Sequence, residues 1–241
     1  MTRPRFEILD RVETPLGVLW LRRREVLSQP GTLVTEVSLD HELLMSSHHT
    51  LSERALATRA LAWLDGSGLR VLVGGLGLGY TAYAALEDER VEHVEVVELV
   101  PRVIDWLEEG LTPLAGALRG DARLHAGAGD VFALLDATPT AQYDAILVDV
   151  DHSPEELLDE HHRAFYSVPG LRRARSWLTP GGVLGIWSSE TNDEVTRALR
   201  ETFAEVRVER IEWHNDLIDR DQVDELFLAR SGGDRMRHHA V

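Results

Sequence analysis

The sequence predicts an α/β protein in which a small antiparallel β unit precedes a mostly parallel sheet that ends in an antiparallel hairpin. Short apolar runs separated by turn residues occupy residues 6–46, which is typical of antiparallel strands. After residue 68, uninterrupted apolar runs alternate with helical patterns, which is typical of a parallel sheet buried on both faces. A polar loop rather than a helix separates the last two apolar runs, which predicts the hairpin.

The first part of the chain is expected to form the antiparallel unit. Its apolar runs are FEIL, VLWLRRR, LVTEVSL and ELLM, and the turn signals Thr14-Pro15-Leu16-Gly17 and Pro30-Gly31 lie between them. From Leu51 to Leu64 apolar residues recur at helical spacing up to the breaker Asp65-Gly66-Ser67-Gly68. We therefore expect a β unit over residues 1–50, a larger domain over 51–230 and a disordered tail over 231–241.

The larger domain is expected to hold seven strands. They are Arg70–Val73, Val94–Glu98, Leu124–Ala126, Tyr143–Val150, Val183–Trp187, Val206–Trp213 and Glu225–Ala229. Helices are expected to run through Ala85, toward Glu109, from Asp130 to Leu135 and from Leu171 to Leu178, where Thr179-Pro180-Gly181-Gly182 ends the last one.

A glycine-rich turn joins the first of these strands to its helix. Gly75, Gly77 and Gly79 alternate with leucines there, and Glu98 closes the next strand about 20 residues later. Such glycines let a ligand approach bare backbone at a helix N-terminus, and such a carboxylate can accept hydrogen bonds from ribose hydroxyls. The pattern predicts a nucleotide site at these four residues, although a tight turn without a ligand has the same pattern.

Two aspartates follow later strands at the same edge of the predicted sheet. Gly129-Asp130 follows the third strand and Asp149 ends the fourth, where ligands of open α/β sheets lie. Helix capping or a loop carboxylate is the simpler alternative for each aspartate. The order of these features, with the terminal hairpin, is typical of class I methyltransferases rather than of NAD-binding dehydrogenases, which would continue with parallel strands.

On these motifs the chain resembles the spermidine synthase-like proteins, or polyamine aminopropyltransferases. The resemblance rests on VLVGGLGLGY, VEVVEL, Gly129-Asp130, YDAILVDVDHSP, Phe165-Tyr166 and LTPGGVLGIWS. It implies a class I methyltransferase fold with a seven-stranded sheet, a homodimer, and S-adenosylmethionine or decarboxylated S-adenosylmethionine as donor. It also implies that Asp130 reads the adenine amino group.

The chain departs from that family at three places. The family's glycine motif carries an aspartate that helps to hold the free amine of the decarboxylated donor, and Gly77 stands in its place. Of a Tyr-His-Glu run that helps to seat the polyamine, Leu51-Ser52-Glu53 keeps only the glutamate. The fourth-strand motif keeps Asp149, but its second aspartate is displaced or replaced in Asp151-His152-Ser153-Pro154. Because rejecting abundant S-adenosylmethionine needs a dedicated charged contact, these departures favour methyl transfer.

The sequence therefore predicts an enzyme that transfers a methyl or related group from S-adenosylmethionine to a small acceptor, which is an amine or a polyamine. True aminopropyl transfer and a non-catalytic nucleotide-binding module remain the alternatives. Asp149 is the candidate that orients the amine and accepts its proton. Asp151 and His152 are the further catalytic candidates, and a solvated loop histidine explains His152 equally well.

Composition argues against several other classes of protein. The formal net charge of −16 repels nucleic acid and anionic membranes, and the chain has no cysteine for disulfides or thiolate metal sites. No apolar stretch has membrane-spanning length and the N-terminus lacks a signal-peptide core, so a cytoplasmic protein is expected. The pairs His48-His49 and His161-His162 lack metal-site spacing, since adjacent side chains are expected to point in different directions, so no metal is expected.

Overall fold

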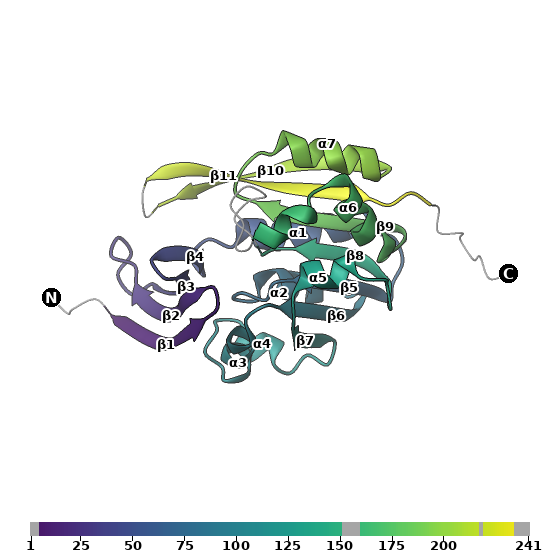
Figure 1. Ribbon diagram of the computed structural model, residues 1–241. Coiled ribbons are helices and arrows are strands. Elements are labelled where there is room, and N and C mark those ends of the chain that lie inside the picture. Colours follow the sequence, from purple (N-terminus) through teal and green to yellow (C-terminus); the bar gives the residue numbers. More distant parts are fainter. Residues whose placement is uncertain (1–4, 151–159, 217–218, 234–241) are drawn as a thin grey trace.

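The computed structural model describes residues 5–150, 160–216 and 219–233, which form two sheets and the helices around the larger one (Figure 1). The smaller sheet comprises β1 (Phe6–Thr14), β2 (Gly17–Glu25), β3 (Leu33–Leu39) and β4 (Glu42–Ser46), antiparallel and in that order. This confirms the predicted antiparallel unit. Its buried residues Leu19, Leu21 and Val37 pack into the same core cluster as Leu76 and Leu78 of the glycine-rich turn.

The larger sheet has seven strands in the order β10-β11-β9-β8-β5-β6-β7. Their bounds are β5 (Leu69–Gly74), β6 (Val91–Glu98), β7 (Leu124–Ala128), β8 (Tyr143–Val148), β9 (Leu178–Ser188), β10 (Glu205–Asn215) and β11 (Arg220–Arg230). The pairs among β5 to β9 are parallel, whereas β11 lies antiparallel to both β9 and β10. The predicted fold class, a mostly parallel sheet with a terminal hairpin, is thereby confirmed.

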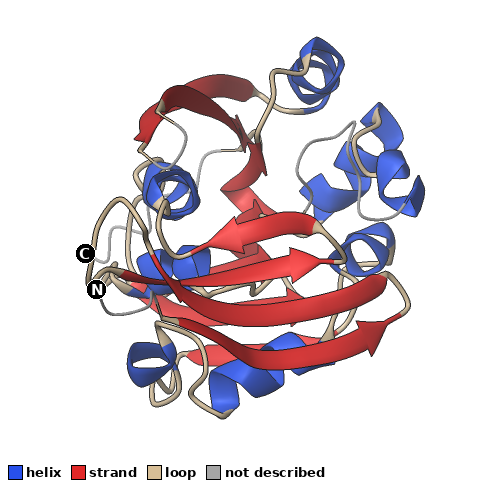
Figure 2. Ribbon diagram, turned by 90° about the vertical axis from the view of Figure 1, so that its left-hand side faces the viewer, coloured by secondary structure: helices blue, strands red, loops and turns tan. Residues whose placement is uncertain are grey.

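Helices cover both faces of this sheet, as Figure 2 shows. They are α1 (Leu51–Leu61), α2 (Tyr80–Leu86), α3 (Pro101–Glu108), α4 (Ala115–Leu118), α5 (Val131–Asp136), the 3₁₀ helix η1 (Glu160–Ala164), α6 (Val168–Ser176) and α7 (Asp193–Thr202). Alternate strand residues enter two separate cores: Val71 and Val73 pack with α1 to α4, and Leu72 packs with α5 to α7. This alternation explains why the central strands are apolar throughout, because both of their faces are covered. No helix in the described ranges is long and apolar enough to cross a membrane.

The structure differs from the predicted elements in β9 and at the end of β8. Thr179-Pro180-Gly181-Gly182 was expected to precede a strand, yet β9 continues through it. The register explains this, because Tyr143 pairs with Leu178 and Ala145 already pairs with Val183, so the intervening residues bulge out of the strand. β8 ends at Val148 rather than at Val150, which leaves Asp149 just beyond the strand.

Helix α7 was not predicted. Its N-cap is Asn192, whose side-chain oxygen accepts a hydrogen bond of 2.8 Å from Val195 N. Its buried residues Val195, Ala198, Leu199 and Thr202 follow helical spacing. The helical spacing of these residues is present in the sequence, but the charged residues between them make it difficult to recognise.

Candidate active site

A cavity lies between the four-stranded sheet and the carboxyl edge of the seven-stranded sheet. One wall includes Leu19, Val37 and Met45 of the smaller sheet. The opposite wall is formed by the glycine-rich turn and by residues at the ends of β6, β7 and β8. Of the predicted site residues, Gly75, Gly77, Gly79, Glu98, Asp130 and Asp149 line this cavity. Asp151 and His152 lie outside the described residues.

The glycine-rich turn needs glycine both for its backbone and for its neighbours. Gly75, Gly77 and Gly79 have φ values of 87°, 51° and 91°, in the left-handed region. A Cβ on Gly75 would lie 2.3 Å from the carbonyl oxygen of Asp149, so the turn packs directly on the end of β8. Gly79 is the N-cap of α2, which leaves the start of that helix open to the cavity without a side-chain cap.

Glu98 fastens the end of β6 to this turn. The side chain is 7% exposed, its Oε2 accepts a 2.8 Å hydrogen bond from Leu76 N, and its Oε1 accepts one of 2.8 Å from Val100 N. Burial raises the pKa of Glu98, and the backbone N–H groups oppose that shift. The backbone N–H groups of Gly77 and Leu99 also lower the pKa of Glu98, so its carboxylate is held by the glycine-rich turn and by the residues that follow β6.

Asp130 has a structural role in addition to its place in the cavity wall. Its Oδ1 accepts a hydrogen bond of 2.8 Å from Phe132 N and so caps α5, as the helix-capping alternative expected. Gly129, the residue before it, does not belong to the cavity lining but donates a backbone hydrogen bond of 2.9 Å to Glu98 O. Gly129 therefore supports the site indirectly, through the backbone at the end of β6.

Glu53 and Asp149 line the cavity, and Asp224 lies close enough for its charge to act on both of them. Asp149 accepts a 2.5 Å hydrogen bond from the Thr81 hydroxyl, Glu53 projects from α1, and Asp224 on β11 accepts one of 2.8 Å from Trp213 Nε1. Burial raises the pKa of Asp149 to about 6, with a smaller contribution from the charge of Asp224 and opposition from Thr81. Burial and then the charge of Asp149 raise the pKa of Glu53 to about 8. Burial also raises the pKa of Asp224.

Because the pKa values of all three carboxyl groups are raised, ionising these groups costs free energy when no cation is bound beside them. A cation placed among the three carboxyl groups relieves both their desolvation and their mutual repulsion. Sequence reasoning missed Asp224 in this arrangement. The available signal was an aspartate two residues before the apolar run Leu226-Phe227-Leu228 of a buried strand.

Aromatic side chains complete the cavity. Trp187 of β9 lines it, and its Nε1 is buried with no hydrogen-bond partner in the described part of the chain. Phe132 also lines it, with the ring of His162 at 4.3 Å between centroids. Tyr166 packs in the core beside Phe165.

Comparison with solved structures identifies the fold. A spermidine synthase in complex with the transition state analogue AdoDATO superposes with a TM-score of 0.73 over 95% of this chain and 75% of its own, at 15% identity. The spermidine synthase of Thermotoga maritima gives a TM-score of 0.69 over 95% of this chain and 74% of its own, at 15% identity. At such identity the likeness shows the fold.

Sequence relatives point to the same group of proteins. The polyamine aminopropyltransferase 2 of Streptomyces coelicolor is 33% identical over 126 residues, which are 51% of this chain and 22% of the relative. The putrescine N-methyltransferase 1 of Nicotiana tabacum is 30% identical over 115 residues, 48% of this chain and 29% of the relative. The chain has the fold of these spermidine synthases and is similar in sequence to both kinds of transferase over about half of its length. No family model matches its sequence.

The chain matches less than a third of the length of these two curated relatives. Their names divide between aminopropyl transfer and methyl transfer, so the transferred group is not decided by sequence relationship. The choice between methyl and aminopropyl transfer has to be argued from the residues of the cavity.

Gly77 is the position where the resemblance to the spermidine synthase-like proteins places an aspartate. A Cβ added there would lie 2.7 Å from the sulfur of Met45, so β4 supplies an uncharged side chain to this space. At the other departure, Leu51 is exposed and Ser52 is buried, with the Ser52 hydroxyl donating a 3.2 Å hydrogen bond to Glu53. Both changes leave Glu53 as the charged group contributed by the start of α1 to the cavity.

Proposed function

We propose that this protein transfers a methyl group from S-adenosylmethionine to a small acceptor that carries an amine. The observation that supports this most directly is the cluster of Glu53, Asp149 and Asp224 beside the glycine-rich turn. Three partly or fully buried carboxyl groups suit a cationic acceptor, whose charge lowers the cost of ionising them.

The donor is proposed to lie along the glycine-rich turn. Glu98 would accept hydrogen bonds from the ribose hydroxyls, Asp130 would contact the adenine, and the backbone of Gly75, Gly77 and Gly79 would allow close approach. The position of these residues around one cavity supports the assignment. Trp187 lines the same cavity, and its buried N–H offers a donor that a bound substrate can satisfy.

Asp149 is proposed to bind the acceptor ammonium and take its proton. The neutral amine then attacks the methyl carbon in line with the sulfonium, the carbon–sulfur bond breaks, and its electron pair returns to sulfur. A pKa of about 6 suits a group that must be ionised near neutral pH and still accept a proton. Because the sulfonium is already activated, holding the two reactants in line provides much of the acceleration.

Aminopropyl transfer is the second candidate, and the Streptomyces coelicolor relative favours it. It requires a site that prefers the decarboxylated donor. In this chain Met45 and Gly77 supply no charge where the resemblance expects a carboxylate. We therefore rank methyl transfer first. A binding module without turnover is the third alternative.

Product analysis tests the proposal. The purified chain is incubated with either donor and a panel of mono- and diamines, including putrescine, and the nucleoside product is identified by mass spectrometry. Methyl transfer gives S-adenosylhomocysteine, and aminopropyl transfer gives methylthioadenosine. Neither product, together with measurable nucleotide binding, would leave only the binding module.

We further propose that residues 51–230 form the donor-binding domain, that 1–50 are an appended unit, and that the protein is a homodimer. Light scattering during size-exclusion chromatography measures the oligomeric state, and a monomer at all concentrations would contradict that part.

A further inference from the structure

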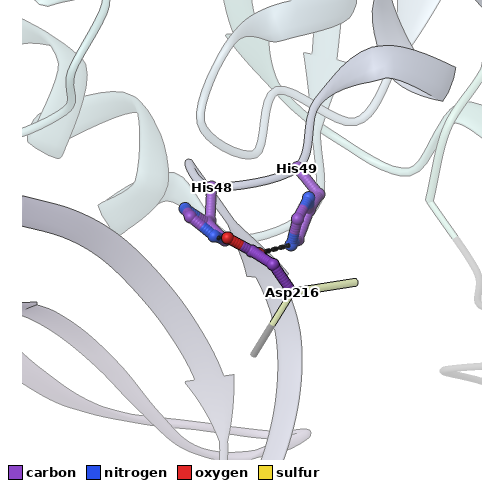
Figure 3. Close-up of side chains that lie close together, drawn as sticks. All are labelled: His48, His49 and Asp216. Carbon is purple, nitrogen blue, oxygen red and sulfur yellow. Dashed lines mark hydrogen bonds and ion pairs between the residues drawn. The ribbon is translucent and has the colours of Figure 1, made fainter. Parts of the chain in front are cut away.

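Three side chains from distant parts of the sequence converge at the end of the β10–β11 hairpin. Figure 3 shows His48 and His49, from the segment between β4 and α1, with both rings directed at the carboxylate of Asp216. His48 Nε2 lies 2.7 Å and His49 Nε2 lies 3.4 Å from Asp216 Oδ1. The sequence-based expectation of no metal rested on the divergence of adjacent histidines, and these two rings do not diverge.

One atom of this group has no hydrogen bond. His49 Nε2 is buried and has no hydrogen-bond partner within the described ranges. A buried nitrogen in that position costs free energy unless a ligand reaches it, and imidazole nitrogen is a common metal ligand. The unsatisfied atom faces the same carboxylate oxygen that His48 contacts.

The surrounding side chains hold this group in place. The Gln29 side-chain amide donates a hydrogen bond to Asp216 Oδ2, the carboxylate oxygen that the histidines do not contact. Trp213 packs against the His49 ring at 4.4 Å between centroids, and the Asn215 side chain hydrogen-bonds that ring. Metal ligands are typically oriented by such outer contacts.

We propose that His48, His49 and Asp216 form a site for one divalent transition-metal ion of the zinc class. The three ligand atoms lie within 4.8 Å of one another. A tetrahedral ion about 2.0–2.1 Å from each ligand separates the ligands by about 3.4 Å. His49 and Asp216 already have that separation, and the His48–Asp216 contact must lengthen by less than about 1 Å.

The chemistry of the ligands also favours this class of ion. Two neutral imidazoles and one carboxylate carry a single negative charge in total. A bound divalent cation therefore leaves only a small net positive charge at the site. Imidazole favours zinc, copper, iron and nickel over magnesium or calcium, which prefer oxygen ligands. Three protein ligands leave a fourth position for water.

The ion would connect the hairpin to the rest of the molecule. Asp216 follows β10, the histidines precede α1, and Gln29 lies between β2 and β3. Trp213, which packs on His49, also donates the hydrogen bond to Asp224 of the acidic cluster. The ion would therefore fix the hairpin end next to the candidate active site. The metal proposal itself does not depend on which group the protein transfers.

Metal titration of the untagged full-length chain tests this inference. After treatment with a chelator and dialysis, the protein is titrated with zinc by calorimetry and with cobalt by visible absorption, which reports tetrahedral coordination. We expect one ion per chain and an increase in the thermal unfolding temperature. His49→Gln, Asp216→Asn and their double variant should each lower the affinity by at least about tenfold.

Matched variants make the result specific. His214 lies on the same hairpin, exposed, with its Nδ1 2.8 Å from Asp221, so His214→Gln should bind zinc as the wild type does. Replacing His238 and His239 by glutamine removes the histidines near the C-terminus and should also change nothing. Circular dichroism of the metal-free proteins checks that each variant folds. Absence of stoichiometric binding, or binding that survives in the His49→Gln and Asp216→Asn variants, would overturn the proposal.

Discussion

At the scale of single residues, Glu98 combines a structural contact with a proposed binding role. Its two oxygens already accept backbone hydrogen bonds from Leu76 and Val100. Glu98→Ala should weaken nucleotide binding by about 1–3 kcal/mol, the loss expected for charge-assisted hydrogen bonds. Isothermal calorimetry measures this, with the exposed Glu92→Gln on the same strand as control. An unchanged affinity in Glu98→Ala would remove Glu98 from the ribose site.

Asp149 is predicted to be the residue without which no transfer occurs. It lies directly after a fully buried strand, where the backbone is rigid, and Thr81 fixes its carboxylate. Asp149→Asn keeps the shape and removes the charge, so turnover should fall by about 10²-fold or more while nucleotide binding stays nearly intact. His152→Ala should cost less. The turnover rates of the two variants test this prediction. A larger loss of turnover in His152→Ala than in Asp149→Asn would assign the essential role to His152 and contradict it.

At the scale of elements, the contact between β4 and the glycine-rich turn is expected to control donor choice. Met45 lies where a side chain at Gly77 would have to go, and no carboxylate is present there. S-adenosylmethionine should therefore bind at least as well as its decarboxylated form. Competitive binding of the two donors measures this, and Met45→Leu is a control that keeps the apolar contact. A clear preference for the decarboxylated donor would restore the aminopropyltransferase interpretation.

The elements that the sequence predicts well are those whose pattern is local. Buried strands such as β5 and β8 are apolar on both faces, and the glycine-rich turn has its own spacing. The continuity of β9 could not be predicted, because Pro180 and two glycines normally end a strand. Here Thr179 donates a 2.9 Å hydrogen bond to Asp144, and Ser231 donates one of 2.8 Å to Gly182. Both contacts are set by tertiary structure.

The candidate site shows the same limit. Glu98, Asp130 and Asp149 could be proposed as cavity residues because each lies at or just after the end of its own strand at one sheet edge. Asp224 and the His48, His49 and Asp216 group depend on where the β10–β11 hairpin lies relative to the start of α1. That placement comes from the pairing of β11 with β9 and from contacts such as His48–Asp216, whose residues are 168 positions apart, and a single sequence does not report such contacts.

At the scale of the whole molecule, the raised pKa values make stability depend on pH. A carboxyl group with a raised pKa binds its proton more tightly in the folded state, so its contribution is most favourable below its unfolded pKa. That contribution is lost as the pH rises through the folded value, which is about 8 for Glu53 and about 6 for Asp149. The free energy of unfolding should therefore fall across this window in the ligand-free protein.

Urea unfolding at several pH values, followed by circular dichroism, measures this dependence. Glu53→Gln should flatten the upper part of the window, because glutamine has no proton to lose. The exposed Glu108→Gln, on α3, serves as the control and should keep the slope of the wild type. An equal slope in Glu53→Gln and wild type would show that Glu53 is not a protonated, buried carboxyl group.

The central claim, methyl transfer to an amine beside the acidic cluster, is tested most directly by following the methyl group itself. The protein is incubated with putrescine and S-adenosylmethionine whose methyl group carries deuterium, and the amine products are analysed by mass spectrometry. The account predicts a deuterated methyl group on the amine, S-adenosylhomocysteine in equal amount, and loss of both products in Asp149→Asn. Formation of methylthioadenosine from the decarboxylated donor, with no labelled amine from S-adenosylmethionine across the amine panel, would contradict it.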